Sequence, residues 1–274
     1  MSQGTVSIGP AFGVVLALLV VIAVAAAMVG RLGVSRAVVT ASVRAILQLG
    51  VVSLLITAVL RSWWATAGFI VLMVLVAAAT SARRVSVLRL GWPVIVPIAA
   101  GVAPAGAVIV LGGTMPHTEV ALLPIAGILI GGAMTATSLS GRRALDELHL
   151  RRGEYEAALA LGFLPRDAAL EVSRPTAGQA LVPAMDQTRT VGLVTLPGAF
   201  VGVLLGGGSA LQAGATQLLV LIALLAAEAI AAAVTLELVA RGVIRRPSWE
   251  ARSSSSGVGV VRMGLFNRFS GRRG

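Results

Sequence analysis

The chain has 274 residues, of which 57% are hydrophobic and only 12% are charged, and its mean hydropathy is +0.94. This composition excludes an ordinary water-soluble globular domain and indicates an integral membrane protein. The net charge is +11, but the arginines fall between apolar runs instead of along one stripe, so we do not expect nucleic acid as a partner. The sequence has no cysteine, which excludes thiolate metal sites.

Seven apolar runs predict membrane-crossing helices, since about 20 apolar residues span a hydrocarbon core of about 30 Å. The runs cover about 11–29, 37–60, 63–80, 92–111, 120–139, 190–205 and 217–239. The first basic residue, Arg31, follows the first run, whereas a cleaved signal peptide carries positive charge before its apolar core. We therefore expect a retained first helix with its N-terminus outside.

The connections between these runs alternate in charge. Four of them are basic, namely those with Arg31 and Arg36, with Arg83, Arg84 and Arg89, with the seven arginines of 142–189, and with the tail from Arg241. Basic connections face the cytoplasm. The expected fold is therefore an all-α polytopic protein of the plasma membrane, with seven transmembrane helices, the N-terminus out and the C-terminus in. Residues 1–245 are expected to form a single transmembrane domain that includes the cytoplasmic segment 142–189, and 246–274 are expected to be a disordered tail.

Residues 142–189 are polar and arginine-rich, unlike the runs on either side. Good helix formers extend from Arg143 to Leu161, and Gly162 can end a helix because it tolerates positive φ. Pro165 suits the first turn of a following helix, where Asp167 is also favourable. The segment therefore predicts a helix-turn-helix that projects into water and docks a partner.

Several motifs carry a family resemblance. They are G-G-A-M-T-A-T-S-L at 131–139, E-Y-E-A-A-L-A-L-G at 154–162, L-V-P-A-M-D-Q-T-R-T-V-G-L-V-T-L-P-G at 181–198 and G-G-G-S-A-L-Q-A-G-A-T-Q at 206–217. The chain resembles the FetB-type ABC permease family, bacterial iron exporters related to plant aluminium-tolerance permeases, from about residue 10 to 240. Ala199 and Phe200 stand where methionine is common in the family.

The resemblance implies a homodimeric permease in the bilayer that docks on a separate ABC ATP-binding subunit. The docking residues it implies are Glu154, Glu156, Ala157, Ala158, Gly162 and Arg166. Arg151, Arg152 and Arg166 could pair with acidic residues of that partner or simply be solvated. The chain contains no P-loop motif and no lysine, so hydrolysis belongs to another chain. No cofactor is expected here; ATP and Mg²⁺ would bind to the partner.

Polar residues inside the apolar runs suggest a transport path, because each is costly in lipid. The candidates are Arg44, Gln48, Met134, Thr135, Ser138, Pro197 and Glu228. Arg44 and Glu228 could instead form a neutralising pair, and the small residues of 131–138 could serve helix packing. Pro197 should kink the sixth helix, either as a hinge or as a packing feature.

The sequence does not identify the cargo. The two histidines, His117 and His149, are expected on opposite sides of the membrane, so a bound metal would need Met134, Met185, Asp186, Glu228 or carbonyls. The leading hypothesis is ATP-driven export of a metal ion such as iron. The alternatives are ABC transport of a nucleotide sugar or another small polar solute, a proton-coupled secondary carrier that uses Glu228, and a membrane scaffold that transports nothing.

Overall fold

The structure is a computed structural model that describes residues 9–85, 92–116 and 118–246. Within these ranges the chain is helical, and an isolated bridge between Val191 and Thr195 is the one β-type pairing. The prediction of an all-α fold is confirmed. The expected disordered tail lies outside the described residues except for Arg246.

The chain divides into two compact units, residues 1–65 and 66–274. In the first unit, α1 (Pro10–Val29) and α2 (Ser35–Val59) pack against each other. Pro10 suits the first turn of α1, because that position has no intrahelical acceptor for its missing N–H. Arg31 lies in the connection with a φ of 49°, next to Gly33 at 71°.

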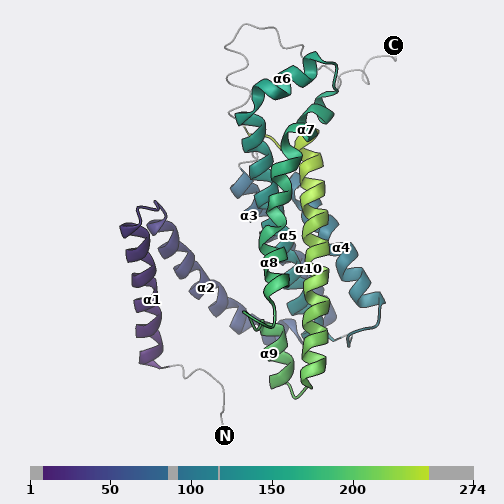
Figure 1. Cartoon of the computed structure of the whole chain (residues 1–274). Helices are drawn as coiled ribbons and strands as arrows, with labels where there is room; N and C mark the ends of the chain where they lie inside the picture. The colour runs from purple at the N-terminus through teal and green to yellow at the C-terminus, as the bar shows by residue number, and fades with distance from the viewer. Residues whose placement is uncertain (1–8, 86–91, 117, 247–274) are drawn as a thin grey trace, which may run out of the picture. The chain divides into compact units, whose positions relative to one another are not determined.

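In the second unit, α10 (Ala210–Ala240) lies between α4 (Ile95–Leu111) and α5 (Glu119–Leu150) and packs on both (Figure 1). Glycine permits the close approach of α4 to α10, because a Cβ on Gly101 would lie 2.3 Å from the Ala227 carbonyl oxygen. The α3 helix (Trp63–Val85) packs on α5, where the hydroxyls of Ser81 and Ser138 are 2.9 Å apart. Ser209 caps α10 through a capping box with Gln212.

Five of the described helices are long and apolar enough to cross a membrane: α1, α2, α3, α5 and α10. The fourth expected span is present as the 17-residue apolar helix α4. The chain is therefore a membrane protein with several apolar helices. The count of seven spans and the orientation stay predictions.

The sixth expected span, 190–205, is not one continuous helix. A helix α8 (Val182–Thr190) ends where that run begins, and α9 (Gly198–Leu205) starts eight residues later. Gly192 takes a φ of 83°, which a helix does not accommodate, and Pro197 has no N–H to donate. The expectation that Pro197 kinks a helix is therefore wrong: it is the N-cap of α9 and follows a break.

The α5 helix has 32 residues, so it is about 48 Å long at about 1.5 Å per residue. The α5 helix is therefore much longer than the apolar run 120–139. Two further helices, α6 (Arg152–Ala160) and α7 (Pro165–Ala177), follow its polar end. The expected single helix from Arg143 to Leu161 is broken at Arg151, which has a φ of −103° and a ψ of 33°. A short 3-10 helix, Gly178–Leu181, joins α7 to α8.

Candidate functional site

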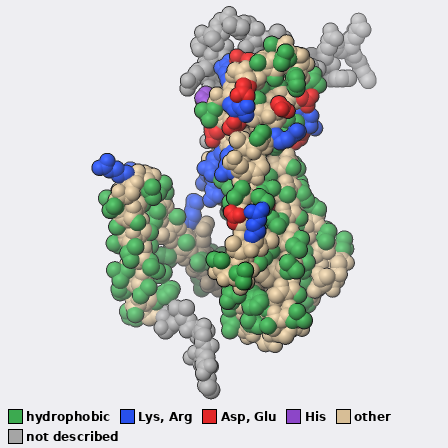
Figure 2. All heavy atoms as spheres, in the orientation of Figure 1, with side chains coloured by type: hydrophobic (Ala, Val, Ile, Leu, Met, Phe, Trp, Pro, Cys, Tyr) green, Lys and Arg blue, Asp and Glu red, His purple; other side chains and the backbone are tan. Residues whose placement is uncertain are grey.

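The helices α6 and α7, with the corner that joins them, form the α6–α7 hairpin (residues 152–177). It lies at one end of the second unit, beyond the apolar part of α5 and α10 (Figure 1). Charged side chains gather at this end, whereas the remaining surface of the unit in this view is mostly apolar (Figure 2). The predicted helix-turn-helix is thus present. Gly162 has a φ of 92° and Pro165 occupies the first turn of α7, as expected.

The two predicted docking glutamates of α6 are each held by an arginine of their own helix or of its N-terminal boundary. Arg151 binds Glu154 and also Glu147, and Arg152 Nε donates to Glu156 Oε1 at 2.7 Å. The Arg151 guanidinium holds the pKa of Glu154 below its ordinary value. These pairs neutralise one another locally, so α6 presents little unpaired charge to a partner.

Arg166 ties the hairpin to the end of α10. Its Nε and Nη2 donate to the two carboxylate oxygens of Glu237 at 2.6 and 2.8 Å, and its Nη1 donates to Asp167 at 2.8 Å. Arg241 Nε donates to the same Glu237 at 2.6 Å. A bidentate arginine–carboxylate pair fixes direction as well as distance. Arg166, which was predicted to contact a docking partner, therefore orients α7 on α10 within the chain itself.

Apolar packing fixes α7 at the same place. Ala169 and Leu170 of α7 form a buried cluster with Ala240 of α10, and the partly buried Leu148 and Tyr155 pack against it. Because the cluster joins α5, α6, α7 and α10, a displacement of the hairpin must be transmitted to the helices that continue into the apolar region.

The corner between α6 and α7 is apolar and exposed. Leu161, Phe163 and Leu164 retain 81%, 48% and 68% of their accessible surface. Ala157, also exposed, faces solvent, and Ala158 is half-buried. Reasoning from the sequence missed the three large apolar residues, although a run of them inside a polar segment was a visible signal. Contiguous exposed apolar residues rimmed by charge are typical of protein-binding surfaces.

Glu228 lies on α10 beside Gly132 of α5. It is buried, and a Cβ on Gly132 of α5 would come within 2.6 Å of its Oε1 and 2.2 Å of Leu224 Cδ1. Among the described residues of this unit, no basic side chain pairs with it. Its proposed pairing with Arg44 is not tested, because Arg44 belongs to the other unit.

The other predicted path residues lie on several helices of the two units, and each unit is described by itself. Arg44 and Gln48 share a face of α2, where they border a shallow surface pocket. On α5, Ser138 is buried against Ser81 and Met134 packs against the core, whereas Thr135 is exposed and donates to its own helix. Ser138 and Met134 therefore take part in helix packing, which was predicted as the alternative to lining a transport path.

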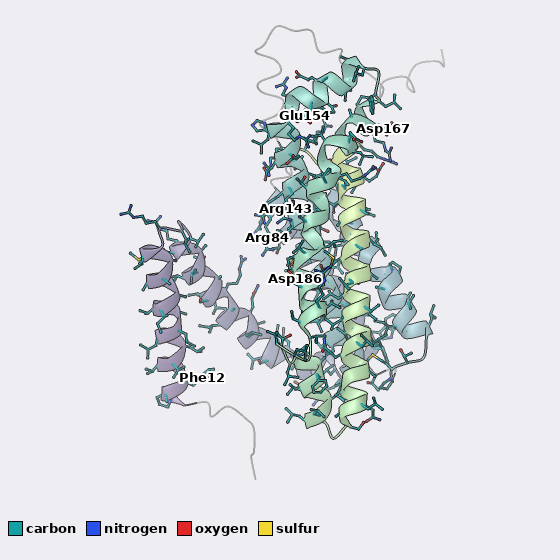
Figure 3. The ribbon with its side chains drawn as sticks, in the orientation of Figure 1. Phe12, Arg84, Arg143, Glu154, Asp167 and Asp186 are labelled. Carbon is teal, nitrogen blue, oxygen red and sulfur yellow. The ribbon has the colours of Figure 1, made fainter. Side chains whose placement is uncertain are left out.

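The break between α8 and α9 places charge beside the apolar helices. Arg189 and Asp186 form an exposed ion pair at 3.5 Å on α8, and Figure 3 shows Asp186 well away from the hairpin, about half-way along α10. Charged residues within a membrane usually face protein or a water-filled cavity. Within the described ranges, no group of three or more His, Asp or Glu residues could hold a metal ion.

Comparison with known proteins places the chain in a family of membrane proteins. The model of the Uncharacterised protein family (UPF0014) matches residues 12–244. The rice UPF0014 membrane protein STAR2 is 34% identical over 216 residues, which cover 77% of this chain and 75% of the relative. The Arabidopsis thaliana Protein ALUMINUM SENSITIVE 3 is 34% identical over 65% of this chain and 66% of its own length.

A bacterial relative carries a more explicit name. The "Probable iron export permease protein FetB" of Escherichia coli is 33% identical over 123 residues, which cover 43% of this chain and 46% of the relative. No solved structure matches the chain. These relatives confirm the family resemblance drawn from the motifs.

Proposed function

Because the chain belongs to the UPF0014 family of membrane proteins, we propose that it is the membrane permease subunit of an ATP-driven ABC transporter of the plasma membrane. In this proposal, the α6–α7 hairpin lies in the cytoplasm and docks on a separate ATP-binding subunit, which holds ATP and Mg²⁺.

The exposed apolar corner of the hairpin is the observation that carries this proposal. Leu161, Phe163 and Leu164 lie at the end of a rigidly anchored pair of helices, where no lipid would cover them. Apolar anchors at the centre of a patch, with charged residues around them, contribute most of the affinity of protein interfaces. The Arg166–Glu237 contact and the cluster around Leu170 would carry the movement of the ATPase to α10.

We further propose that two copies meet along α8 and α9. Gly198 and Gly202 lie one turn apart on α9, and a Cβ on either would meet no heavy atom within 4 Å. Small residues at this spacing permit a close approach of a second helix in lipid. Pairing at this face would enclose the exposed Asp186 and Arg189 of both copies between the proteins instead of leaving them against lipid.

The proposed cargo is a metal ion such as iron, moved outward. This assignment is supported by the name of the FetB relative. Two copies would supply Asp186 and Glu228 twice, and oxygen ligands suit hard cations. A nucleotide sugar or another small polar solute is the alternative ABC cargo.

A proton-coupled carrier is the alternative mechanism. The observation that favours it is the burial of Glu228, which has no basic partner among the described residues of its own unit. Reconstituted permease and ATPase in liposomes distinguish the two mechanisms. The ABC proposal predicts iron flux that requires ATP and persists without a pH gradient, and Glu228→Gln should then lower flux without removing its dependence on ATP. Flux driven by a pH gradient with no ATPase present, and lost in Glu228→Gln, would refute the proposal. Substituting a nucleotide sugar for iron in the same assay tests the cargo.

A further inference from the structure

Four arginines lie together where α3 and α5 leave their apolar runs. Arg83 and Arg84 are in the last turn of α3, and Arg142 and Arg143 follow the apolar part of α5. The Ser81–Ser138 hydrogen bond sets the register of the two helices just before the arginines. Figure 3 shows Arg84 and Arg143 at the same level, and Figure 2 shows basic side chains gathered on this side of the unit below the hairpin.

The packing one step further along confirms this register. A Cβ on Gly141 would lie 3.2 Å from Val85 Cγ2, so the C-terminal end of α3 lies against α5 at Gly141, immediately beside the arginines. Tertiary packing therefore brings the two pairs of arginines to neighbouring positions on α3 and α5, in addition to any effect of their sequence positions on membrane orientation. We name this group the arginine cluster (Arg83, Arg84, Arg142 and Arg143).

The arginine cluster has no acidic partner among the described residues. The nearest acidic residues along α5, Asp146 and Glu147, are already paired with Arg246 and Arg151. Arg142 Nε reaches only its own helix, the carbonyl oxygen of Ser138, at 3.4 Å. Four positive charges close together without counter-charge repel one another, so this arrangement favours a bound anion.

Arg143 gives the most specific indication of a ligand. Its Nη1 is buried and has no hydrogen-bond partner among the residues that the structure describes. A buried, charged donor that lacks an acceptor is costly. An oxygen atom supplied by a ligand between α3 and α5 would remove that cost.

The surroundings indicate which anion fits. Guanidinium groups bind phosphate oxygens in bidentate fashion, and basic pockets between membrane helices bind phospholipid head groups. Below the arginines, α3 exposes Val71, Leu72, Leu75 and Val76. A lipid would place its phosphate on the arginines and its acyl chains along this apolar face, whereas a soluble phosphate would leave that face uncovered.

We propose that the arginine cluster binds the phosphate head group of an anionic phospholipid from the leaflet on the hairpin side of the membrane. Bound there, the phosphate bridges α3 and α5 and supplies an acceptor for Arg143. The inference requires that these helices span the membrane, but it does not require that the chain dock an ATPase or carry iron.

Native mass spectrometry of the purified permease, without any ATPase, tests this inference. Dioleoyl phosphatidylglycerol is titrated against dioleoyl phosphatidylcholine, and thermal unfolding is followed with the same lipids. The wild type should bind the anionic lipid about tenfold or more tightly than phosphatidylcholine. This difference is about the contribution of one pair of charge-assisted hydrogen bonds. Arg84→Gln with Arg143→Gln should remove this preference and the accompanying thermal stabilisation.

Matched variants separate a site from general basic charge. Arg31→Gln with Arg36→Gln removes the same charge from the α1–α2 connection and the first turn of α2, and it should leave the preference within about twofold of the wild type. Equal losses in the two double variants would overturn the inference. Arg84→Lys with Arg143→Lys keeps the charge but lacks the bidentate fork, so it should fold and still weaken binding.

A third arm identifies the source of the phosphate. Inorganic phosphate at millimolar concentration should give little thermal stabilisation compared with phosphatidylglycerol. If inorganic phosphate stabilises the wild type as well as the lipid does, and the Arg84 and Arg143 variants abolish both effects, the site takes a soluble phosphate and the lipid assignment is wrong. If neither anion is preferred over phosphatidylcholine, the inference fails entirely.

Discussion

Truncating the apolar corner of the hairpin should weaken ATPase binding more than any change to its charges. The perturbation is Leu161→Ala combined with Leu164→Ala. Both side chains are exposed in the free chain, at 81% and 68% of their accessible surface, so the fold should lose little when they are shortened. The effect is expected at the interface with the partner.

The magnitude follows from the area that docking would bury. Leucine to alanine removes about three methylene equivalents at about 0.8 kcal/mol each, or about 2.4 kcal/mol when burial is complete. Multiplied by the exposed fractions of Leu161 and Leu164, this value gives about 1.9 and about 1.6 kcal/mol of binding free energy that the two side chains can contribute on docking. The double variant should therefore raise Kd by up to about 300-fold, since about 1.4 kcal/mol is tenfold.

The assay is a titration of the ATP-binding subunit onto permease held in lipid nanodiscs. Leu32→Ala is the matched control, because Leu32 is 66% exposed and lies in the α1–α2 connection. Its Kd should equal that of the wild type. A change of less than about threefold for the double variant, well below the 300-fold limit, would refute the idea that the corner is the anchor.

Three further predictions concern the parts that hold the hairpin and the helices in place. Arg166→Ala breaks the partly exposed ion pair with Glu237, so it should cost only about 0.2–1 kcal/mol of stability. Amide hydrogen exchange in α7 should nevertheless become faster. Unchanged exchange would mean that the contact does not orient α7. Gly101→Ala should destabilise the protein by about 1–3 kcal/mol or more, because the new Cβ meets the backbone of α10. Gly106→Ala is the control, because its Cβ would meet nothing within 4 Å. Equal melting temperatures of the two variants in detergent would contradict the close packing of α4 on α10. Gly162→Ala should cost about 1–2 kcal/mol because of its positive φ, and Gly153→Ala, inside α6, should instead stabilise by about 0.5–1 kcal/mol.

Local chemistry made the hairpin predictable from sequence. Gly162 tolerates the positive φ that ends a helix, and Pro165 has a fixed φ that suits the first turn of a helix, and the structure places both accordingly. The break at Arg151 was not predictable in the same way, because every residue around it except Gly153 is a good helix former. Local pairs of Arg151 with Glu147 and Glu154 accompany that break, and Arg151 Nη1 also donates to the carbonyl oxygen of Val172 in α7 at 3.5 Å.

The hydrophobic pattern alone misjudged the segment 190–205, which was predicted to be a single helix. An apolar run predicts that a stretch lies in lipid or a core, but it does not show whether the stretch is one helix. Gly192 and Pro197 break it, and the result is α8, an extended turn and α9. Side-chain contacts between different helices could not be predicted from the sequence either. The Arg166–Glu237 pair joins residues 71 positions apart, and nothing in either local pattern connects them.

Photo-crosslinking at the corner of the hairpin tests the central claim most directly. Leu161 is replaced by a photoreactive phenylalanine analogue in the full chain, which is irradiated in its own membranes, purified and identified with its adducts by mass spectrometry. The same analogue at Leu32 is the control. The account predicts a crosslink to an ABC ATP-binding subunit from position 161 and none from position 32. Crosslinks from position 161 only to lipid or to other membrane proteins, with no ATP-binding subunit among them, would contradict it.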